Sequence, residues 1–194
     1  ILDINAERGA IVSEEIGCFF VNTNVSDELS AQSAITKSLQ YMDGINTAIN
    51  CAGIVVGIKT FGKKGTHPLS AFKKTLDINL VGSFNISRLV AATMEDNTPE
   101  PDGARGVIIN TASIAAFDGQ KGQAAYAASK GGIVSMTLPM ARDLASIGVR
   151  VMAIAPGIFS TPMLAGLSKD VRNILAADVP NPARLGDPNE YARL

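Results

Sequence analysis

Short runs of apolar residues alternate with long amphipathic or alanine-rich segments along this chain of 194 residues. Five of the apolar runs are predicted as strands, at residues 1–3, 18–21, 47–50, 106–111 and 149–155. Three segments between them are long enough to form helices, at residues 26–42, 68–94 and 124–147. Strands that alternate with helices are joined by crossovers and run parallel. The pattern therefore predicts an α/β fold with a doubly wound parallel sheet.

The composition suits a single domain spanning residues 1–194. Lys and Arg number 17 against 18 Asp and Glu, and this balance argues against direct binding of nucleic acid. The longest apolar stretches, such as 54–56, are far shorter than the roughly 20 residues of a bilayer span, so we expect no membrane insertion. Two Cys and one His provide neither a disulfide framework nor a metal site. We therefore expect an intracellular, cytoplasmic location, or a mitochondrial one in a eukaryote.

A proton-transfer pair is predicted in the segment 124–147, where Lys130 follows Tyr126 by four residues. In a helix this spacing places both side chains on one face, one turn apart. A phenol has an ordinary pKa near 10, and lowering it by about 3 units requires roughly 4 kcal/mol of preferential stabilisation of the phenolate. A lysine ammonium in a dry cleft can supply much of that stabilisation. The alternative is an aromatic side chain beside a solvated lysine.

Ser113 follows the predicted strand 106–111 and precedes Tyr126 by thirteen residues. Open α/β sheets bind ligands at the carboxyl ends of their strands, where a hydroxyl can donate a hydrogen bond to a carbonyl or a developing oxyanion. The combination of Ser113, Tyr126 and Lys130 therefore favours chemistry over a purely structural role for the pair.

Several motifs of this sequence resemble those of the short-chain dehydrogenase/reductase family, in the family's order and over most of the chain. They are Asn50-Cys-Ala-Gly53 after a strand, Asn79 in Asp77-Ile-Asn-Leu-Val-Gly82, Ser113, Tyr126 with Lys130, and Pro156-Gly157 followed by Thr161-Pro162. The resemblance implies a Rossmann-type fold, an oxidoreductase, and a small-molecule substrate.

The resemblance also implies a catalytic tetrad of Asn79, Ser113, Tyr126 and Lys130. In the family the Tyr is the general acid and base, and the Ser orients the substrate oxygen. The Lys lowers the pKa of the Tyr and holds the nicotinamide ribose, while the Asn positions a water for proton relay. The alternative for Asn79 is a brace or cap within its helix.

NAD is the expected cofactor. Asp3 stands where the second strand of a dinucleotide-binding fold ends, and a carboxylate there accepts a hydrogen bond from the adenosine ribose and repels a 2′-phosphate. The alternative is an ordinary acid at a strand end. The resemblance assigns further cofactor contacts to Asn24, Val25, Asn50, Cys51, Ala52, Gly53, Tyr126, Lys130, Pro156, Gly157, Phe159 and Thr161. At Asn24 the family more often has Asp, although an amide can also bind an adenine edge.

The family's Gly-rich loop cradles the pyrophosphate and should precede the strand that ends at Asp3, where this chain has no such segment. A final strand and its helix are also missing after Leu194. We therefore expect residues 1–194 to be a dinucleotide-binding and catalytic domain that is incomplete at both ends. Because the first strand would be central in the sheet, its absence should leave two strand edges unpaired.

Segments 115–126, 136–144 and 184–188 resemble one branch of the family most closely. That branch implies NAD-dependent oxidation of the 3-hydroxyl of an acyl-CoA thioester, with hydroxysteroids as a second substrate class. Ser113, Gln120 and Tyr126 are the expected substrate contacts, although Gln120 could equally belong to a plain loop. Helices of this kind pack across subunits in the family, which implies a homotetramer.

Two alternatives remain open from the sequence. The first is an NADPH-dependent 3-oxoacyl reductase of fatty-acid synthesis, against which Asp3 argues. The second is a non-catalytic scaffold subunit that keeps the fold and serves a partner complex. The complete tetrad argues that any scaffold role is additional to catalysis.

Overall fold

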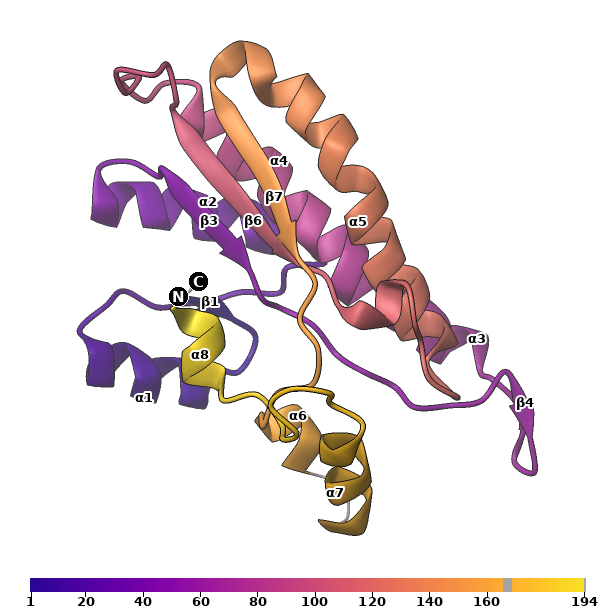
Figure 1. Ribbon diagram of the computed structural model, residues 1–194. Helices are drawn as coiled ribbons and strands as arrows, with labels where there is room; N and C mark the ends of the chain where they lie inside the picture. Colours follow the sequence, from indigo (N-terminus) through magenta and orange to yellow (C-terminus); the bar gives the residue numbers. More distant parts are fainter. Residues whose placement is uncertain (166–168, 194) are drawn as a thin grey trace.

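The computed structural model describes residues 1–165 and 169–193, and its main strands run parallel with helices between them (Figure 1). β1 (Leu2–Asp3) pairs with β2 (Val21–Asn22). A second sheet holds β3 (Thr47–Asn50), β6 (Gly106–Thr111) and β7 (Val149–Ile154) in the order β3-β6-β7. The predicted parallel α/β arrangement is therefore present. The two groups of strands are not hydrogen-bonded to each other.

Eight α-helices lie within the described ranges: α1 (Ala6–Ile16), α2 (Glu28–Met42), α3 (Leu69–Leu76), α4 (Gly82–Met94), α5 (Ala124–Leu144), α6 (Pro162–Ala165), α7 (Lys169–Ala177) and α8 (Pro188–Ala192). A π-helical turn over Asp77–Val81 joins α3 to α4, and 3-10 turns cover Ile114–Ala116 and Ala145–Ile147. Among these described helices, none has both the length and the apolar character that a bilayer crossing needs.

Side-chain caps set the start of α1 and α2. The Asn5 side chain accepts a hydrogen bond from the backbone N–H of Arg8 at 3.0 Å, and Asp27 accepts one from Ser30 at 2.7 Å. α1 ends at Gly17, whose φ of 65° is left-handed and favours glycine. The helix α1 was not predicted from the sequence. Its Gly9 weakens the helical pattern, but a Cβ there would come within 2.1 Å of the Phe20 ring, so packing requires the glycine.

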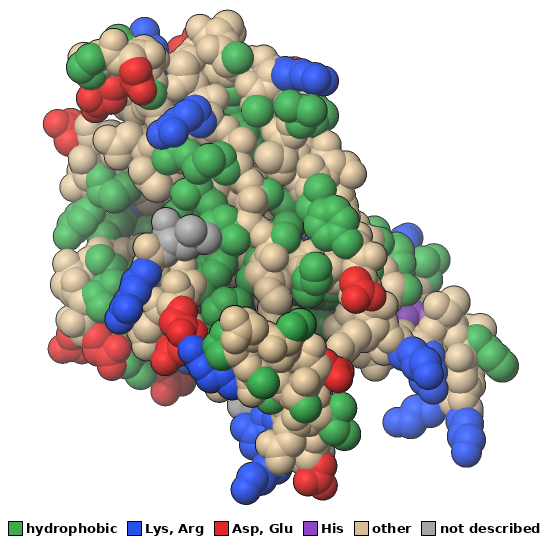
Figure 2. Space-filling view, in the orientation of Figure 1, with side chains coloured by type: hydrophobic (Ala, Val, Ile, Leu, Met, Phe, Trp, Pro, Cys, Tyr) green, Lys and Arg blue, Asp and Glu red, His purple; other side chains and the backbone are tan. Residues whose placement is uncertain are grey.

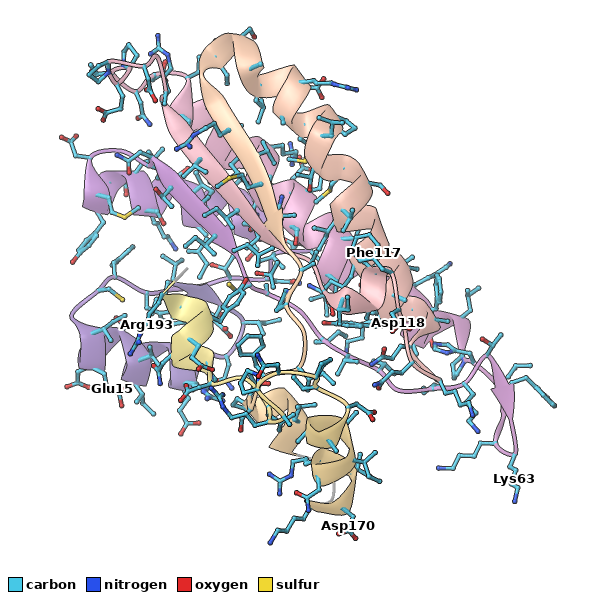
Figure 3. All side chains as sticks on the ribbon, viewed as in Figure 1. Glu15, Lys63, Phe117, Asp118, Asp170 and Arg193 are labelled. Atoms are coloured by element: carbon cyan, nitrogen blue, oxygen red, sulfur yellow. The ribbon has the colours of Figure 1, made fainter. Side chains whose placement is uncertain are left out.

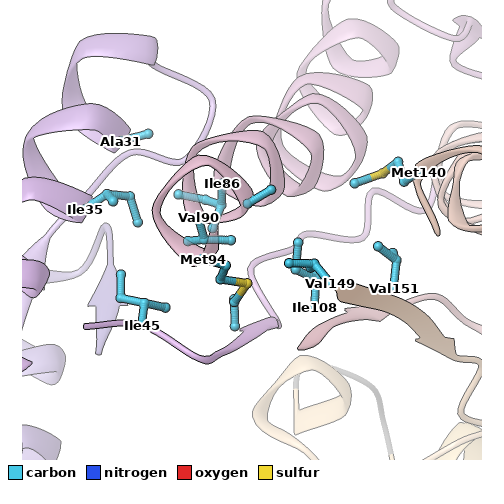
Figure 4. Packing of buried hydrophobic residues seen from close by; sticks show 12 residues of the cluster. Ala31, Ile35, Ile45, Ile86, Val90, Met94, Ile108, Met140, Val149 and Val151 are labelled. Atoms are coloured by element: carbon cyan, nitrogen blue, oxygen red, sulfur yellow. The ribbon is translucent and has the colours of Figure 1, made fainter. Parts of the chain in front are cut away.

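One hydrophobic core joins α2, α4 and α5 to the three-stranded sheet (Figure 4). Met94 of α4 and Ile108 of β6 are fully buried, and Val149 of β7 is nearly so. Removing an apolar side chain of this size from water contributes roughly 1.5–3 kcal/mol. The core therefore fixes α4 and α5 relative to β6, just beyond whose carboxyl end Ser113 lies.

The other face of this sheet is less covered by the described residues. Burial alternates along β3 and β7, and Ile49 and Met152 are 60% and 43% exposed. Strands that are apolar on both faces predict helices on both sides. The helices α2, α4 and α5 instead share the core on the face that carries Ala48 and Val151. Among the described residues, helices therefore cover one face of the sheet fully, whereas the other face leaves Ile49 and Met152 partly exposed.

Three predicted elements differ in detail from the structure. The strand predicted at 18–21 forms at Val21–Asn22, where it can pair with β1. Residues 58–68, whose polar, Gly- and Lys-containing sequence predicts an exposed insertion, contain an antiparallel hairpin of β4 (Phe61–Gly62) and β5 (Gly65–Thr66). The helix predicted at 68–94 is divided by the π-helical turn, because that turn fits around the buried Asn79.

Candidate active site

Asn79 is held at the centre of the π-helical turn between α3 and α4, and it is fully buried. Its Nδ2 donates to the backbone carbonyl of Ile54 at 2.9 Å, and its Oδ1 accepts from the backbone N–H of Ile54 at 2.8 Å. These two bonds clamp the helix to the segment that follows β3. Such π-turns often occur at functional sites because they widen the helix at one residue.

Ser129 links Asn79 to the backbone of Tyr126. The Nδ2 of Asn79 donates to Ser129 Oγ at 3.0 Å, and Ser129 Oγ donates to the carbonyl oxygen of Tyr126 at 2.7 Å. Ser129 has no exposed surface. A role for Ser129 was not predicted from the sequence, although its position between Tyr126 and Lys130 places it on the same part of α5. The link connects two members of the predicted tetrad through one buried hydroxyl.

Lys130 is buried one turn after Tyr126 and is 5% exposed. Its Nζ donates to the carbonyl oxygen of Thr111 at 2.5 Å and lies 5.7 Å from the centre of the Tyr126 ring. Burial lowers the pKa of Lys130 from 10.5 to about 8, and the nearby Cys51 thiol opposes this shift. At neutral pH the side chain is therefore still mostly an ammonium, held between the end of β6 and the Tyr126 ring.

Ser113 occupies the turn that follows β6 and is 7% exposed. Its Oγ accepts a hydrogen bond from the backbone N–H of Ala115 at 3.2 Å, which leaves its own hydrogen available. The turn it begins packs against α5. The next N–H, of Ile114, donates to the carbonyl of Pro156 at 3.0 Å, so the segment after β7 lies against the same turn.

Gly53 marks where these elements converge. A Cβ at Gly53 would lie 3.4 Å from Asn79 Oδ1 and 3.8 Å from Lys130 Nζ. The backbone that follows β3 therefore passes close to both side chains, at the carboxyl edge of the sheet where open α/β folds bind ligands. A buried hydroxyl, a phenol, an ammonium and a clamped amide can together bind a polar oxygen and move a proton.

Of the residues predicted for the adenosine end of the cofactor, Asn24 lines a hollow of about 440 Å³. Its lining consists of Ile4, Asn24, Ser26, Ser70, Lys73, Lys74, Asp77 and Ile78. Asp3 ends β1 and is exposed; its Oδ1 accepts from the N–H of Asn5 at 2.8 Å, and its Oδ2 has no partner among the described residues. The Oδ1 of Asn24 accepts from both the N–H and the hydroxyl of Ser26. The lysines of α3 were not predicted.

Asn50 points into the sheet interior rather than toward the open edge, and it is 8% exposed. Its Nδ2 donates to Asn110 Oδ1 at 2.8 Å and to Ser87 Oγ at 3.0 Å. The buried Nδ2 of Asn110 has no hydrogen-bond partner among the residues that the structure describes. The adjacent Cys51 is exposed, and its Sγ lies 3.6 Å from Thr111 Oγ1. The first Asn of the motif thus joins β3 to β6, and the residues after it turn toward the site.

The remaining predicted residues are more dispersed. Phe159 stacks edge-on against Tyr191 at 5.7 Å and pairs with Gly186, and the Thr161 N–H donates to the Phe159 carbonyl at 2.9 Å. Val25 packs against Gly82 at the start of α4. Gln120 is exposed in the loop before α5, where its N–H donates to the side chain of Gln123 at 2.9 Å. Among the described residues, no hydrogen bond joins the Gln120 side chain to Ser113 or Tyr126.

This geometry belongs to a known class of enzymes. A sequence model of the short chain dehydrogenases matches residues 1–172. The chain therefore belongs to the short-chain dehydrogenase family and is an oxidoreductase, as the sequence analysis predicted.

Particular relatives are more specific than the family. The rat and human proteins named 3-hydroxyacyl-CoA dehydrogenase type-2 are 53% and 54% identical over 198 aligned residues, which include all of this chain and 76% of each relative. A crystal structure of 3-hydroxyacyl-CoA dehydrogenase type-2 from Mycobacterium avium matches with a TM-score of 0.92 and 38% identity, over 100% of this chain and 76% of that one. The predicted fold class is thereby confirmed. The family implies a nicotinamide cofactor and a small-molecule substrate.

Proposed function

We propose that this chain is an NAD-dependent dehydrogenase that oxidises the 3-hydroxyl of acyl-CoA thioesters, with Tyr126 as the general acid and base. The observation that carries the proposal is the buried link from Asn79 through Ser129 to Tyr126, with Lys130 held one turn further along α5. The names of the relatives support the substrate class. Hydroxysteroids are a second class of secondary alcohol that the same chemistry would accept.

In the oxidation direction, Tyr126 removes the proton of the substrate hydroxyl while Ser113 donates a hydrogen bond to the same oxygen. A nicotinamide cofactor, when bound, would supply the acceptor for the hydride of the carbinol carbon, so that the alcohol would become a ketone. The ammonium of Lys130 stabilises the phenolate form of Tyr126, because opposite charges close together favour the ionised state. The same ammonium, which lies close to the backbone at Gly53, is suited to hold the nicotinamide ribose.

Asn79 has most of its hydrogen-bonding capacity engaged. Its two amide hydrogens go to Ile54 and Ser129, and its Oδ1 accepts one bond from Ile54, which leaves one lone pair of that oxygen for a relay water. We assign Asn79 first to holding Ser129, and through it Tyr126, in register with the segment after β3. Water positioning is the second role.

The unpartnered Oδ2 of Asp3 supports NAD, since it is free to accept from a ribose hydroxyl and would repel a 2′-phosphate. Asn24 lines the hollow, which supports its assignment to the adenosine side together with its neighbour Val25. We assign Cys51, Ala52 and Gly53 to the ribose side, because the backbone at Gly53 passes close to Lys130 Nζ. We assign Pro156, Gly157, Phe159 and Thr161 to the nicotinamide end, because the segment they form begins against the Ser113 turn.

A second candidate function is NADPH-dependent reduction of 3-oxoacyl thioesters. Lys73 and Lys74 line the same hollow as Asn24, and two ammonium groups there would attract a 2′-phosphate. Asp3 opposes this choice. A homotetramer also belongs to the proposal, since Val81 of the π-helical turn, Phe84 of α4 and Leu138 of α5 are about half exposed and would be covered by a second subunit.

The initial rate of reduction of NAD and of NADP by the full-length protein tests the proposal, with 3-hydroxybutyryl-CoA and one hydroxysteroid as substrates. Fast formation of NADH on the thioester is expected. A strong preference for NADP would favour the second candidate. No reduction of either nucleotide with either alcohol would refute the proposed function.

A further inference from the structure

Asn24 lies just beyond the carboxyl end of β2, beside the end of β1. The two strands pair with Asp3 opposite Asn22, and the N–H of Thr23 donates to the carbonyl of Asp3 at 2.8 Å. Asn24 follows directly and lines the hollow described above. Because the proposed function assigns the adenosine ribose to Asp3, it also assigns the base of that ribose to this hollow.

The walls of the hollow suit a flat ring. Ile4 and Ile78 contribute apolar side chains that can cover the faces of a base, which leaves the choice of base to the polar groups at its edge. The lysines of the β4–β5 hairpin belong to a different part of the surface. Figure 3 shows Lys63 on a projection far from Glu15 of α1, and Figure 2 shows basic side chains gathered on that projection.

Two donors of Ser26 fix the orientation of the Asn24 amide. The backbone N–H of Ser26 donates to Asn24 Oδ1 at 3.2 Å, and the Ser26 hydroxyl donates to the same atom at 2.8 Å. A backbone N–H can only donate, so the amide atom that faces it must be the oxygen. Both lone pairs of Oδ1 are thereby engaged, and the side chain has no acceptor left for a ligand.

The free polar groups of this turn are donors. Among the described residues, neither Asn24 Nδ2 nor the backbone N–H of Val25 has a hydrogen-bond partner. The turn itself is held in place, because the Asn24 N–H donates to Ser30 Oγ at 3.0 Å and Asn85 Nδ2 donates to the Val25 carbonyl at 2.9 Å. A base in the hollow therefore meets Asn24 as a donor only.

Purines differ in what they offer to such a donor. Adenine has a 6-amino group that donates and ring nitrogens N1 and N7 that accept, whereas hypoxanthine has a 6-carbonyl that accepts. An asparagine selects adenine when its oxygen accepts from the 6-amino group while its nitrogen donates to N7. Asn24 lacks the free oxygen. Its Nδ2 can donate to a ring nitrogen of adenine or to the 6-carbonyl of hypoxanthine, and it gains no bond from the amino group.

We propose that Asn24 determines the base specificity of the cofactor site and makes the enzyme bind a 6-oxopurine dinucleotide about as well as the adenine dinucleotide. This inference rests on the proposed function, since it requires the adenosine ribose at Asp3. A carboxylate at position 24 would reverse the preference. One of its oxygens would keep both bonds from Ser26, while the other would accept from the 6-amino group and repel a 6-carbonyl.

The test is a fluorescence titration of the full-length protein with NADH and with reduced nicotinamide hypoxanthine dinucleotide. The two ligands share the fluorescent nicotinamide half, so the titration gives a Kd for each without any alcohol substrate. The variant Asn24→Asp exchanges the donor for an acceptor. The matched control Asn46→Asp makes the same change at an exposed residue just before the amino end of β3.

We expect the two Kd values of the wild type to agree within about fivefold. Asn24→Asp should shift their ratio by at least about tenfold in favour of adenine, because hydrogen bonds to a charged acceptor are the stronger ones. Asn46→Asp should keep the wild-type ratio. Stronger discrimination by the wild type, a smaller shift in Asn24→Asp, or an equal shift in the control would overturn the inference.

Failure of this inference is distinguishable from failure of the proposed function. Binding of both dinucleotides with the expected ratios, but without oxidation of 3-hydroxybutyryl-CoA, would support the role of Asn24 and refute the proposed substrate. Oxidation of the thioester with an unchanged Kd ratio in Asn24→Asp would overturn the role of Asn24 alone. Binding of neither dinucleotide by the wild type would overturn both.

Discussion

The bridge through Ser129 gives the sharpest prediction for the candidate site. Ser129→Ala removes the acceptor of the 3.0 Å bond from Asn79 and the donor of the 2.7 Å bond to the Tyr126 carbonyl. Buried polar groups that lose a partner cost about 1–3 kcal/mol, so we expect the free energy of unfolding to fall by about 2 kcal/mol. For a chain of this size that corresponds to a decrease in Tm of roughly 4–8 °C.

Activity should decrease as well, because Tyr126 loses the restraint that fixes its position relative to Asn79. A small misplacement of a reacting group is costly, and we expect kcat to fall about tenfold while the affinity for the nucleotide stays within about twofold. Steady-state rates below the Tm of the variant, together with nucleotide titration, measure both quantities.

Ser38→Ala is the matched control for this prediction. Ser38 is also buried in a helix, and its hydroxyl donates to the carbonyl of Ala34 at 2.9 Å, but α2 carries none of the predicted catalytic residues. The control should lose stability and keep its kcat. The reasoning is refuted if Ser129→Ala loses stability to the same extent and retains wild-type kcat, because Ser129 would then act on the fold alone.

Three further predictions follow from the site and the surface. Burial lowers the pKa of Lys130 to about 8, so the unfolded chain binds more protons than the folded chain between about pH 8 and 10.5, and the free energy of unfolding rises with pH there. Across that range, urea unfolding should show the wild type gaining about 3 kcal/mol relative to Lys130→Met. Parallel pH curves for the two proteins would contradict this prediction. Asp3→Ala should raise the ratio of kcat/KM for NADP to that for NAD by about tenfold, since it removes a repulsive carboxylate; an unchanged ratio would remove Asp3 from cofactor selection. Phe84→Asp places a charge on a half-exposed apolar position of α4 and should dissociate the proposed tetramer. Light scattering should then give a smaller mass for the variant than for the wild type, and an equal mass for the two proteins would contradict the prediction.

The strands and helices next to the site were predictable because their patterns are unambiguous. The run at Gly106–Thr111 is apolar and bounded by polar residues, and the structure has β6 with the same bounds. The spacing of Tyr126 and Lys130 predicted one helical face, and both residues lie on α5 with Lys130 Nζ near the Tyr126 ring. Local periodicity is sufficient where tertiary packing agrees with it.

Other features depend on contacts that a sequence pattern does not contain. α1 contains Gly9 near its middle, where the close Phe20 ring leaves little room for a side chain. The glycine weakens the helical pattern of this segment. The β4–β5 hairpin has strands of two residues each, which are too short for an alternation of apolar and polar residues to be visible. The bridge by Ser129 requires knowing that the π-helical turn brings Asn79 against α5. Asn50 was predicted at the cofactor, but its pairing with Asn110 follows from the register of β3 and β6.

The most direct test of the account is the activity of Tyr126→Phe, which removes the phenolic hydroxyl and keeps the ring. The variant should bind NAD with an affinity within about threefold of the wild type in a fluorescence titration, yet its rate on 3-hydroxybutyryl-CoA should fall by at least about a hundredfold. Retention of the rate within about tenfold, in a variant with the Tm of the wild type, would show that Tyr126 is not the general acid and base.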